Sequence, residues 1–203
     1  DDAARGVAVY GSSVYVAGYT GGALPGQTNK GGNWDAFVRK YDSYGNVKWT
    51  RQFGTSADDA ARGVAVYGSS VYVAGFTGGA LPGQTNKGYR DAFVRKYDAY
   101  GNVKWTRQFG SSAEDHAWGV AVYGSSIYVA GYTGGALPGQ TNKGNWDAFV
   151  RKYDSYGNVK WTRQFGTSAD DAAQGVSVSS SALYFAGDLY SGQMAYVYKY
   201  TVQ

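Results

Sequence analysis

The single histidine, His116, follows two carboxylates, Glu114 and Asp115. A histidine beside a carboxylate is the least that acid/base or nucleophilic catalysis requires. Three other copies of this stretch have alanine at the same position, and no G-x-S-x-G serine motif accompanies the histidine. We therefore expect His116 to be a substitution in an exposed loop, and we expect the chain not to be an enzyme.

Pairs of acidic residues recur along the chain, and a hard cation such as calcium prefers several oxygen ligands of this kind. The pairs are Asp1-Asp2, Asp58-Asp59, Glu114-Asp115 and Asp170-Asp171. None has the spacing of a calcium loop, and aspartate commonly accepts hydrogen bonds from backbone N–H groups in turns. We expect this turn-capping role, with no metal site and no cofactor. The absence of cysteine from the sequence excludes disulfides and thiolate sites.

An aromatic residue between an amide and a carboxylate is suited to sugar binding, because the flat ring stacks on a sugar while the polar groups bond to its hydroxyls. Asn33-Trp34-Asp35 has this composition and returns as Asn145-Trp146-Asp147, whereas the copy between them has Tyr89-Arg90. The structural alternative is that Asp35 caps the start of a strand while Trp34 covers the edge of a sheet. Both interpretations remain open at the level of sequence.

The charge of the chain is mild and evenly spread. The 203 residues include 19 Lys and Arg against 15 Asp and Glu, a formal net charge of +4. The basic residues alternate with acidic ones, and no RNA-reading motif is present, so we expect no nucleic-acid binding. No apolar run approaches the roughly 18 residues of a membrane helix, so we expect no insertion into a membrane.

The whole chain is an internal repeat of about 56 residues. Its units are residues 1–57, 58–113, 114–169 and 170–203. The composition includes 20 Tyr and 31 Gly, which favours closely packed strands joined by tight turns. A fixed period of this length with strand-like content is typical of propeller blades or another repeat array.

Each complete unit is expected to form two hairpins. In the first unit, residues 6–10 and 14–20 are strand-like runs separated by Gly11-Ser12-Ser13, and residues 35–42 and 46–53 flank a second short turn. The two hairpins make a four-stranded antiparallel meander whose innermost strand must be small, as "GVAV" is. The fourth unit shortens its middle connection to residues 190–194 and ends after "AYVYKYTVQ", residues 195–203, so its blade is expected to lack the outer strand.

The outer strand of a unit shows which face is buried. Val47, Trp49, Arg51 and Phe53 alternate with polar residues and so share one face of the strand. We expect this face to pack on the next blade, with the guanidinium over the indole and the tryptophans substantially buried.

The runs "GVAVYGSSVYVAGYT", "DAFVRKYDSYGNVKW" and "RQFGTSADD" resemble the bacterial β-propeller repeats called SBBP. The resemblance covers the three complete units and, more weakly, the fourth. It implies an all-β fold, a β-propeller of four-stranded antiparallel blades with about four blades in this chain. It also implies a secreted or cell-surface protein.

A ligand is expected on the face that carries the long connections, because binding residues concentrate on loops held by a rigid scaffold. Most differences between otherwise similar units also lie there, at positions that we expect to be exposed. The differences are at Arg5, Arg62, Trp118 and Gln174, at Ala3, Ala60, His116 and Ala172, and at Trp34, Arg90 and Trp146. Neutral drift and the tuning of a binding face are both open explanations. The candidate ligand-binding residues are Arg5, Trp34, Arg62, Arg90, Trp118 and Trp146.

The sequence thus favours a non-enzymatic binding or scaffold module with an unidentified protein or glycan partner. The alternative is a structural subunit whose role is self-assembly. Because the fourth unit lacks an outer strand, we expect a homo-oligomer, with a head-to-tail dimer closing an eight-bladed ring as the favoured form. A closed four-bladed monomer and a piece of a longer array are the other two possibilities.

Overall fold

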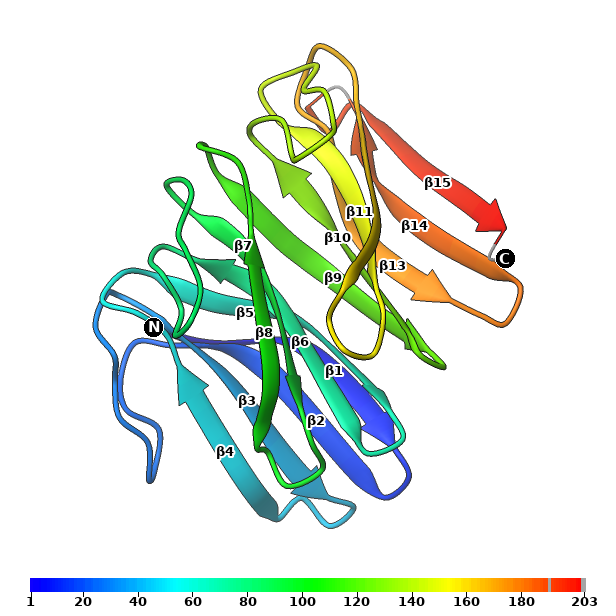
Figure 1. Cartoon of the computed structure of the whole chain (residues 1–203). Coiled ribbons are helices and arrows are strands. Elements are labelled where there is room, and N and C mark those ends of the chain that lie inside the picture. The colour runs from blue at the N-terminus through cyan, green and yellow to red at the C-terminus, as the bar shows by residue number, and fades with distance from the viewer. Residues whose placement is uncertain (190, 202–203) are drawn as a thin grey trace.

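The computed structural model describes residues 1–189 and 191–201, and this part of the chain is all-β. Its strands form four separate antiparallel sheets that follow one another in chain order (Figure 1). Three sheets have four strands each, paired in chain order, and the fourth has three. The expected four-stranded meander is therefore confirmed in the first three units, and the described part of the fourth unit has three strands, without an outer strand, as expected. Tyr190, Val202 and Gln203, which belong to the expected last connection and last strand, lie outside the described residues.

The strand bounds repeat closely from unit to unit. The first sheet contains β1 (Asp2–Tyr10), β2 (Ser13–Thr20), β3 (Asp35–Asp42) and β4 (Val47–Phe53). The second contains β5 (Asp59–Tyr67), β6 (Ser70–Thr77), β7 (Asp91–Tyr97) and β8 (Val103–Phe109). The third contains β9 (Asp115–Tyr123), β10 (Ser126–Thr133), β11 (Asp147–Tyr153) and β12 (Val159–Phe165). The fourth contains β13 (Ala172–Val178), β14 (Ala182–Leu189) and β15 (Met194–Thr201).

The first strand of each unit is longer than predicted because it contains a β-bulge. In β1, Ala4 pairs with Gly18 and Gly6 pairs with Ala17, which leaves Arg5 as the extra residue. The same irregularity occurs in β5, β9 and β13. The extra residues of the four bulges are Arg5, Arg62, Trp118 and Gln174. The bulge shifts the alternation of side chains, so the strand continues to Asp2 although the pattern suggests a start at Gly6.

Successive sheets pack face to face around the first strand of each unit, with β1 against β5, β5 against β9 and β9 against β13. An apolar cluster fills each junction. In the first junction, the indole nitrogen of Trp49 donates to the carbonyl oxygen of Ala99 in the next unit at 3.0 Å. The guanidinium of Arg51 lies 5.7 Å from the centre of the Trp49 ring and donates from Nε to the carbonyl oxygen of Gly101 at 2.7 Å. The predicted packing role of this face is confirmed, although the tryptophans are half-buried.

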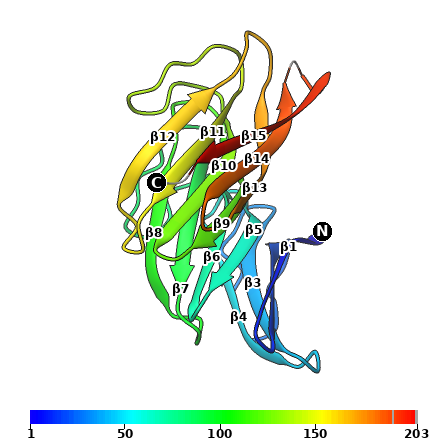
Figure 2. The same ribbon diagram turned by 90° about the vertical axis from the view of Figure 1, so that its right-hand side faces the viewer.

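Among the residues that the structure describes, no further sheet packs on the outer faces of the first and the last sheet. The order of the sheets runs from β1–β4 to β13–β15 without returning, as both views show (Figures 1 and 2). Val7 is 68% exposed, whereas the equivalent Val64 and Val120 inside the stack are each 8% exposed. At the other end, Val197 is 74% exposed. Within the described residues, the four sheets therefore form an open stack, and the closed four-bladed monomer is not formed.

None of the described residues belongs to a helix of the length and apolarity that spanning a bilayer would require.

Candidate functional site

The extra residues of the four bulges meet in one place. They line a pocket of about 330 Å³, to which the first strand of each of the four sheets contributes one residue. The lining residues are Arg5, Arg62, Trp118 and Gln174. We call this the axial pocket. Because a bulge re-aims the side chain of its extra residue, the irregularity of these strands is what brings four distant residues to a common site.

Two cationic side chains lie in the axial pocket without an acidic partner in the described part of the chain. Arg5 donates from Nη2 to the Tyr19 hydroxyl at 3.0 Å. Arg62 makes no hydrogen bond or ion pair with any described residue, and its Nε is buried. Its guanidinium lies 5.9 Å from the Tyr19 ring centre and 5.5 Å from that of Phe76. Burial, followed by the charge of Arg5, lowers the pKa of Arg62, but a guanidinium remains charged.

Around the axial pocket, three long-connection residues cover three aromatic rings of the second strands. Trp34 packs on Tyr19 with ring centroids 4.9 Å apart, and Trp146 packs on Tyr132 at 4.8 Å. In the second unit, Arg90 takes this place, with its guanidinium 5.0 Å from the Phe76 ring centre. The edge of this layer reaches the axial pocket, because Trp118 meets Tyr132 edge to face at 5.1 Å.

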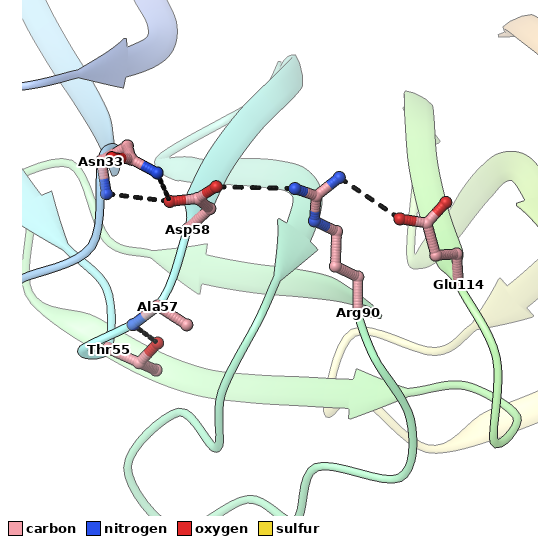
Figure 3. Close-up of polar contacts among 6 residues, drawn as sticks. All are labelled: Asn33, Thr55, Ala57, Asp58, Arg90 and Glu114. Atoms are coloured by element: carbon pink, nitrogen blue, oxygen red, sulfur yellow. Dashed lines mark hydrogen bonds and ion pairs between the residues drawn. The ribbon is translucent and has the colours of Figure 1, made fainter.

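Arg90 also joins two units by ion pairs. Its Nη2 lies 3.5 Å from a carboxylate oxygen of Asp58, and its Nη1 lies 3.3 Å from one of Glu114 (Figure 3). The other oxygen of Asp58 accepts hydrogen bonds from the backbone N–H and the amide of Asn33 at 2.8 and 3.0 Å. A second pocket of about 490 Å³ adjoins this bridge and is lined by Asn33, Asp58, Tyr89 and Arg90 among others. Unlike the axial pocket, it contains its own counter-charges.

The six candidate residues predicted from the sequence thus lie in one region. Arg5, Arg62 and Trp118 line the axial pocket, and Trp34, Arg90 and Trp146 belong to the layer around it. The expectation that the variable positions are exposed is wrong for several of them. His116 and the equivalent Ala60 and Ala172 are buried, because the bulge extends the first strand over residues that resemble a loop in the sequence.

The expectation that His116 lies in an exposed loop is wrong. The residue lies on β9 and is only 6% exposed. Its ring stacks between Phe76 and Tyr132, at centroid distances of 4.2 and 4.8 Å. Burial, and then the charges of Arg90 and Arg62, lower the pKa of His116 to about 3. The imidazole is therefore neutral at pH 7. Neither preceding acid pairs with the imidazole, since Glu114 binds Arg90 and Asp115 accepts from Ser111.

The second aspartate of each acidic pair accepts a hydrogen bond from a backbone N–H, as expected. Asp59 accepts from the backbone N–H of Thr55 at 2.5 Å, and Asp115 accepts from that of Ser111 at 2.7 Å. Asp35, at the start of β3, accepts from the Lys30 N–H and from the Gln52 amide, both at 2.7 Å. Burial raises the pKa of Asp59 and of Asp115 to about 6. Across residues 1–189 and 191–201, no group of three or more potential ligands is arranged to hold a metal ion.

No sequence signal distinguishes the ring layer of the second strands, because Tyr19, Phe76 and Tyr132 lie in runs with the ordinary pattern of a strand. Gln174 is among the variable positions but not among the six predicted site residues. The only signal that could have revealed it was its alignment with Arg5, Arg62 and Trp118.

No protein-family model matches the chain. The chain is similar to the regulatory protein FlaEY of Caulobacter vibrioides, with 31% identity over 192 residues. This match covers 83% of the chain but only 20% of FlaEY, so the chain spans about a fifth of the length of that relative. The resemblance to SBBP repeats stays a prediction.

Proposed function

We propose that this chain is a non-enzymatic binding module that holds a protein or glycan partner at the axial pocket and the ring layer around it. One observation carries the proposal. Units that are otherwise nearly identical differ at the bulge, and the four bulge residues converge on one pocket. A rigid repeated scaffold with varied residues at a shared opening is suited to recognition.

The ring layer extends the candidate surface beyond the pocket. Trp146 is exposed and lies on Tyr132, while Trp34 is half-buried on Tyr19. Indole rings held in place by a second aromatic ring offer a pre-formed apolar surface, which lowers the entropy lost when a ligand binds.

The proposal predicts that replacing Trp34 and Trp146 together by alanine weakens binding by about tenfold or more, the loss expected when aromatic anchors are truncated. Binding would be measured on a glycan array and then by calorimetry with the best ligand. The control is the double variant Tyr44→Ala, Tyr156→Ala, which removes two exposed rings from the turns between third and fourth strands. Equal affinities for the tryptophan variant and the wild type would refute this site.

We further propose that the four sheets are blades of a β-propeller and that the protein acts at the cell surface or outside the cell. Support for the propeller comes from the four-stranded meanders and the packing of each first strand against the next. Support for the location comes from the resemblance to SBBP repeats alone.

A second candidate function is self-assembly, which the exposed end faces favour. Val7 and Val9 are each 68% exposed on the first sheet, and Tyr184 and Val197 are exposed on the fourth. The two faces correspond to the two sides of an internal junction, so they would fit a head-to-tail contact between chains. Two chains joined in this way would close an eight-bladed ring.

Self-assembly predicts a species of two chain masses in sedimentation equilibrium at micromolar concentration. The variant Val7→Glu, Val9→Glu is expected to shift this species to one chain mass, because it places charge in the apolar contact. Tyr44→Glu, on an exposed turn, is the control. A wild type of one chain mass at all concentrations would argue against the dimer and leave the binding function intact.

A further inference from the structure

We propose that the axial pocket binds the carboxylate of an acidic sugar, a uronic acid unit. This inference rests on the proposed binding function and names its ligand class.

The axial pocket is positively charged and therefore favours an anionic ligand. Arg5 and Arg62 both line it, and no carboxylate is among its described lining residues. Two like charges in a partly buried site destabilise one another unless an opposite charge lies between or beside them.

The nearby carboxylates of the described chain bind groups other than Arg5 and Arg62. Asp58 and Glu114 bind Arg90, and Asp188 accepts a hydrogen bond from the Gln174 amide. Arg62 in particular has an unused hydrogen-bond donor, since its Nε is buried without a partner in the described residues. A ligand carboxylate would supply the missing acceptor.

The shape of the donor set favours a carboxylate. A guanidinium presents parallel N–H groups that match the two oxygens of a carboxylate, and such charge-assisted pairs are strong. The Arg5 guanidinium is partly used by Tyr19, whereas that of Arg62 is free of hydrogen bonds within the described residues. Arg62 is therefore the main anchor of the proposal.

The remaining wall favours a sugar over a peptide. The other two lining residues are uncharged: Trp118 contributes an apolar ring, and Gln174 contributes an amide. An indole packs against the C–H groups of a sugar ring. The amide nitrogen of Gln174 donates to Asp188, which leaves the amide oxygen to accept from a sugar hydroxyl, a bond that the carboxylate of an acidic side chain cannot make. The volume of about 330 Å³ is near the lower end of small-molecule sites, roughly 300–1,000 Å³, and suits one sugar unit.

The test is calorimetric titration of the full chain with sugars that differ only at one carbon: D-glucuronate against D-glucose, and D-galacturonate against D-galactose. Triglutamate and inorganic phosphate are titrated in parallel to represent an acidic peptide and a simple anion. We expect a uronate to bind and the matching neutral sugar to bind at least about tenfold more weakly. Added salt is expected to lower the affinity for the uronate.

The decisive variant is Arg62→Gln. It places at this bulge the side chain that the fourth unit already carries as Gln174, so the fold is expected to persist, which an unchanged urea midpoint would verify. Uronate affinity is expected to fall about tenfold or more. The matched control is Arg163→Gln, which removes the same charge from an exposed position on β12.

The outcomes separate the two proposals. Equal binding of uronate and neutral sugar, tighter binding of triglutamate or phosphate, or equal losses in Arg62→Gln and Arg163→Gln would each overturn the uronate inference while the binding function stands. Failure of every probe here and of every glycan on the array would overturn the uronate inference and the glycan form of the binding function.

Discussion

Replacing Gly75 by alanine is expected to destabilise the protein by at least about 4 kcal/mol, which is a large effect for one methyl group. Gly75 lies on β6 opposite the bulge of β5. A Cβ atom there would lie 1.9 Å from the carbonyl oxygen of Ala60 and 2.9 Å from the Cα of Ala61. Both contacts are with buried backbone, so neither can be relieved by turning a side chain. Relief would require the bulge itself to move.

Urea denaturation followed by circular dichroism would measure this loss. Gly175→Ala is the control, because a Cβ on Gly175 meets no atom within 4 Å. Alanine also restricts the unfolded chain more than glycine does, so the control is expected to be neutral or to stabilise by up to about 1 kcal/mol. A loss below about 1 kcal/mol for Gly75→Ala would mean that the close approach at the bulge is not required.

The regular parts of the fold can be predicted from the sequence, whereas the bulge cannot. The repeat, the two hairpins and the buried face of the outer strand follow from periodicity, since Trp49 and Phe53 alternate regularly with polar residues. The bulge has no such signature: its extra residue is Arg5 in one copy and Trp118 in another. One inserted residue breaks the alternation, so the stretch before Gly6 reads as a loop.

The same feature limits the prediction of the site. Variation between copies singled out Arg62 and Trp118, and this comparison needs no knowledge of the fold. That they share a pocket depends on the stacking of β5 against β9, a contact between units that no local pattern encodes. The burial of His116 cannot be predicted for the same reason, because it depends on Phe76 from the neighbouring sheet.

The stability of His116→Ala relative to the wild type is expected to depend strongly on pH. The folded protein holds the pKa of His116 at about 3, against an ordinary value of 6.5. Between these values, the unfolded chain binds a proton that the folded protein does not, so the free energy of unfolding of the wild type falls as the pH is lowered. The alanine variant lacks this contribution.

The buried carboxyl groups change the free energy of unfolding with pH in the opposite direction to His116. Asp59 and Asp115 have a pKa of about 6 in the folded protein, against 3.8 ordinarily. Each therefore binds a proton more readily when folded, and its contribution to stability rises as the pH falls from above 6 towards 4. Both groups are present in the wild type and in His116→Ala, so their effect largely cancels in the difference.

Urea denaturation of both proteins at half-unit steps from pH 7 to pH 4 would give this difference directly. The wild type is expected to lose roughly 1.4 kcal/mol relative to the variant for each pH unit below 6.5, or roughly 3 to 4 kcal/mol over the range. The fold should tolerate the change, because alanine occupies the equivalent position at Ala60 and Ala172. The cavity left by the ring adds only a constant offset, independent of pH. A difference that stays constant from pH 7 to pH 4 would show that His116 takes up its proton in the folded state as freely as in the unfolded one, and that the stack between Phe76 and Tyr132 does not exclude the charged ring.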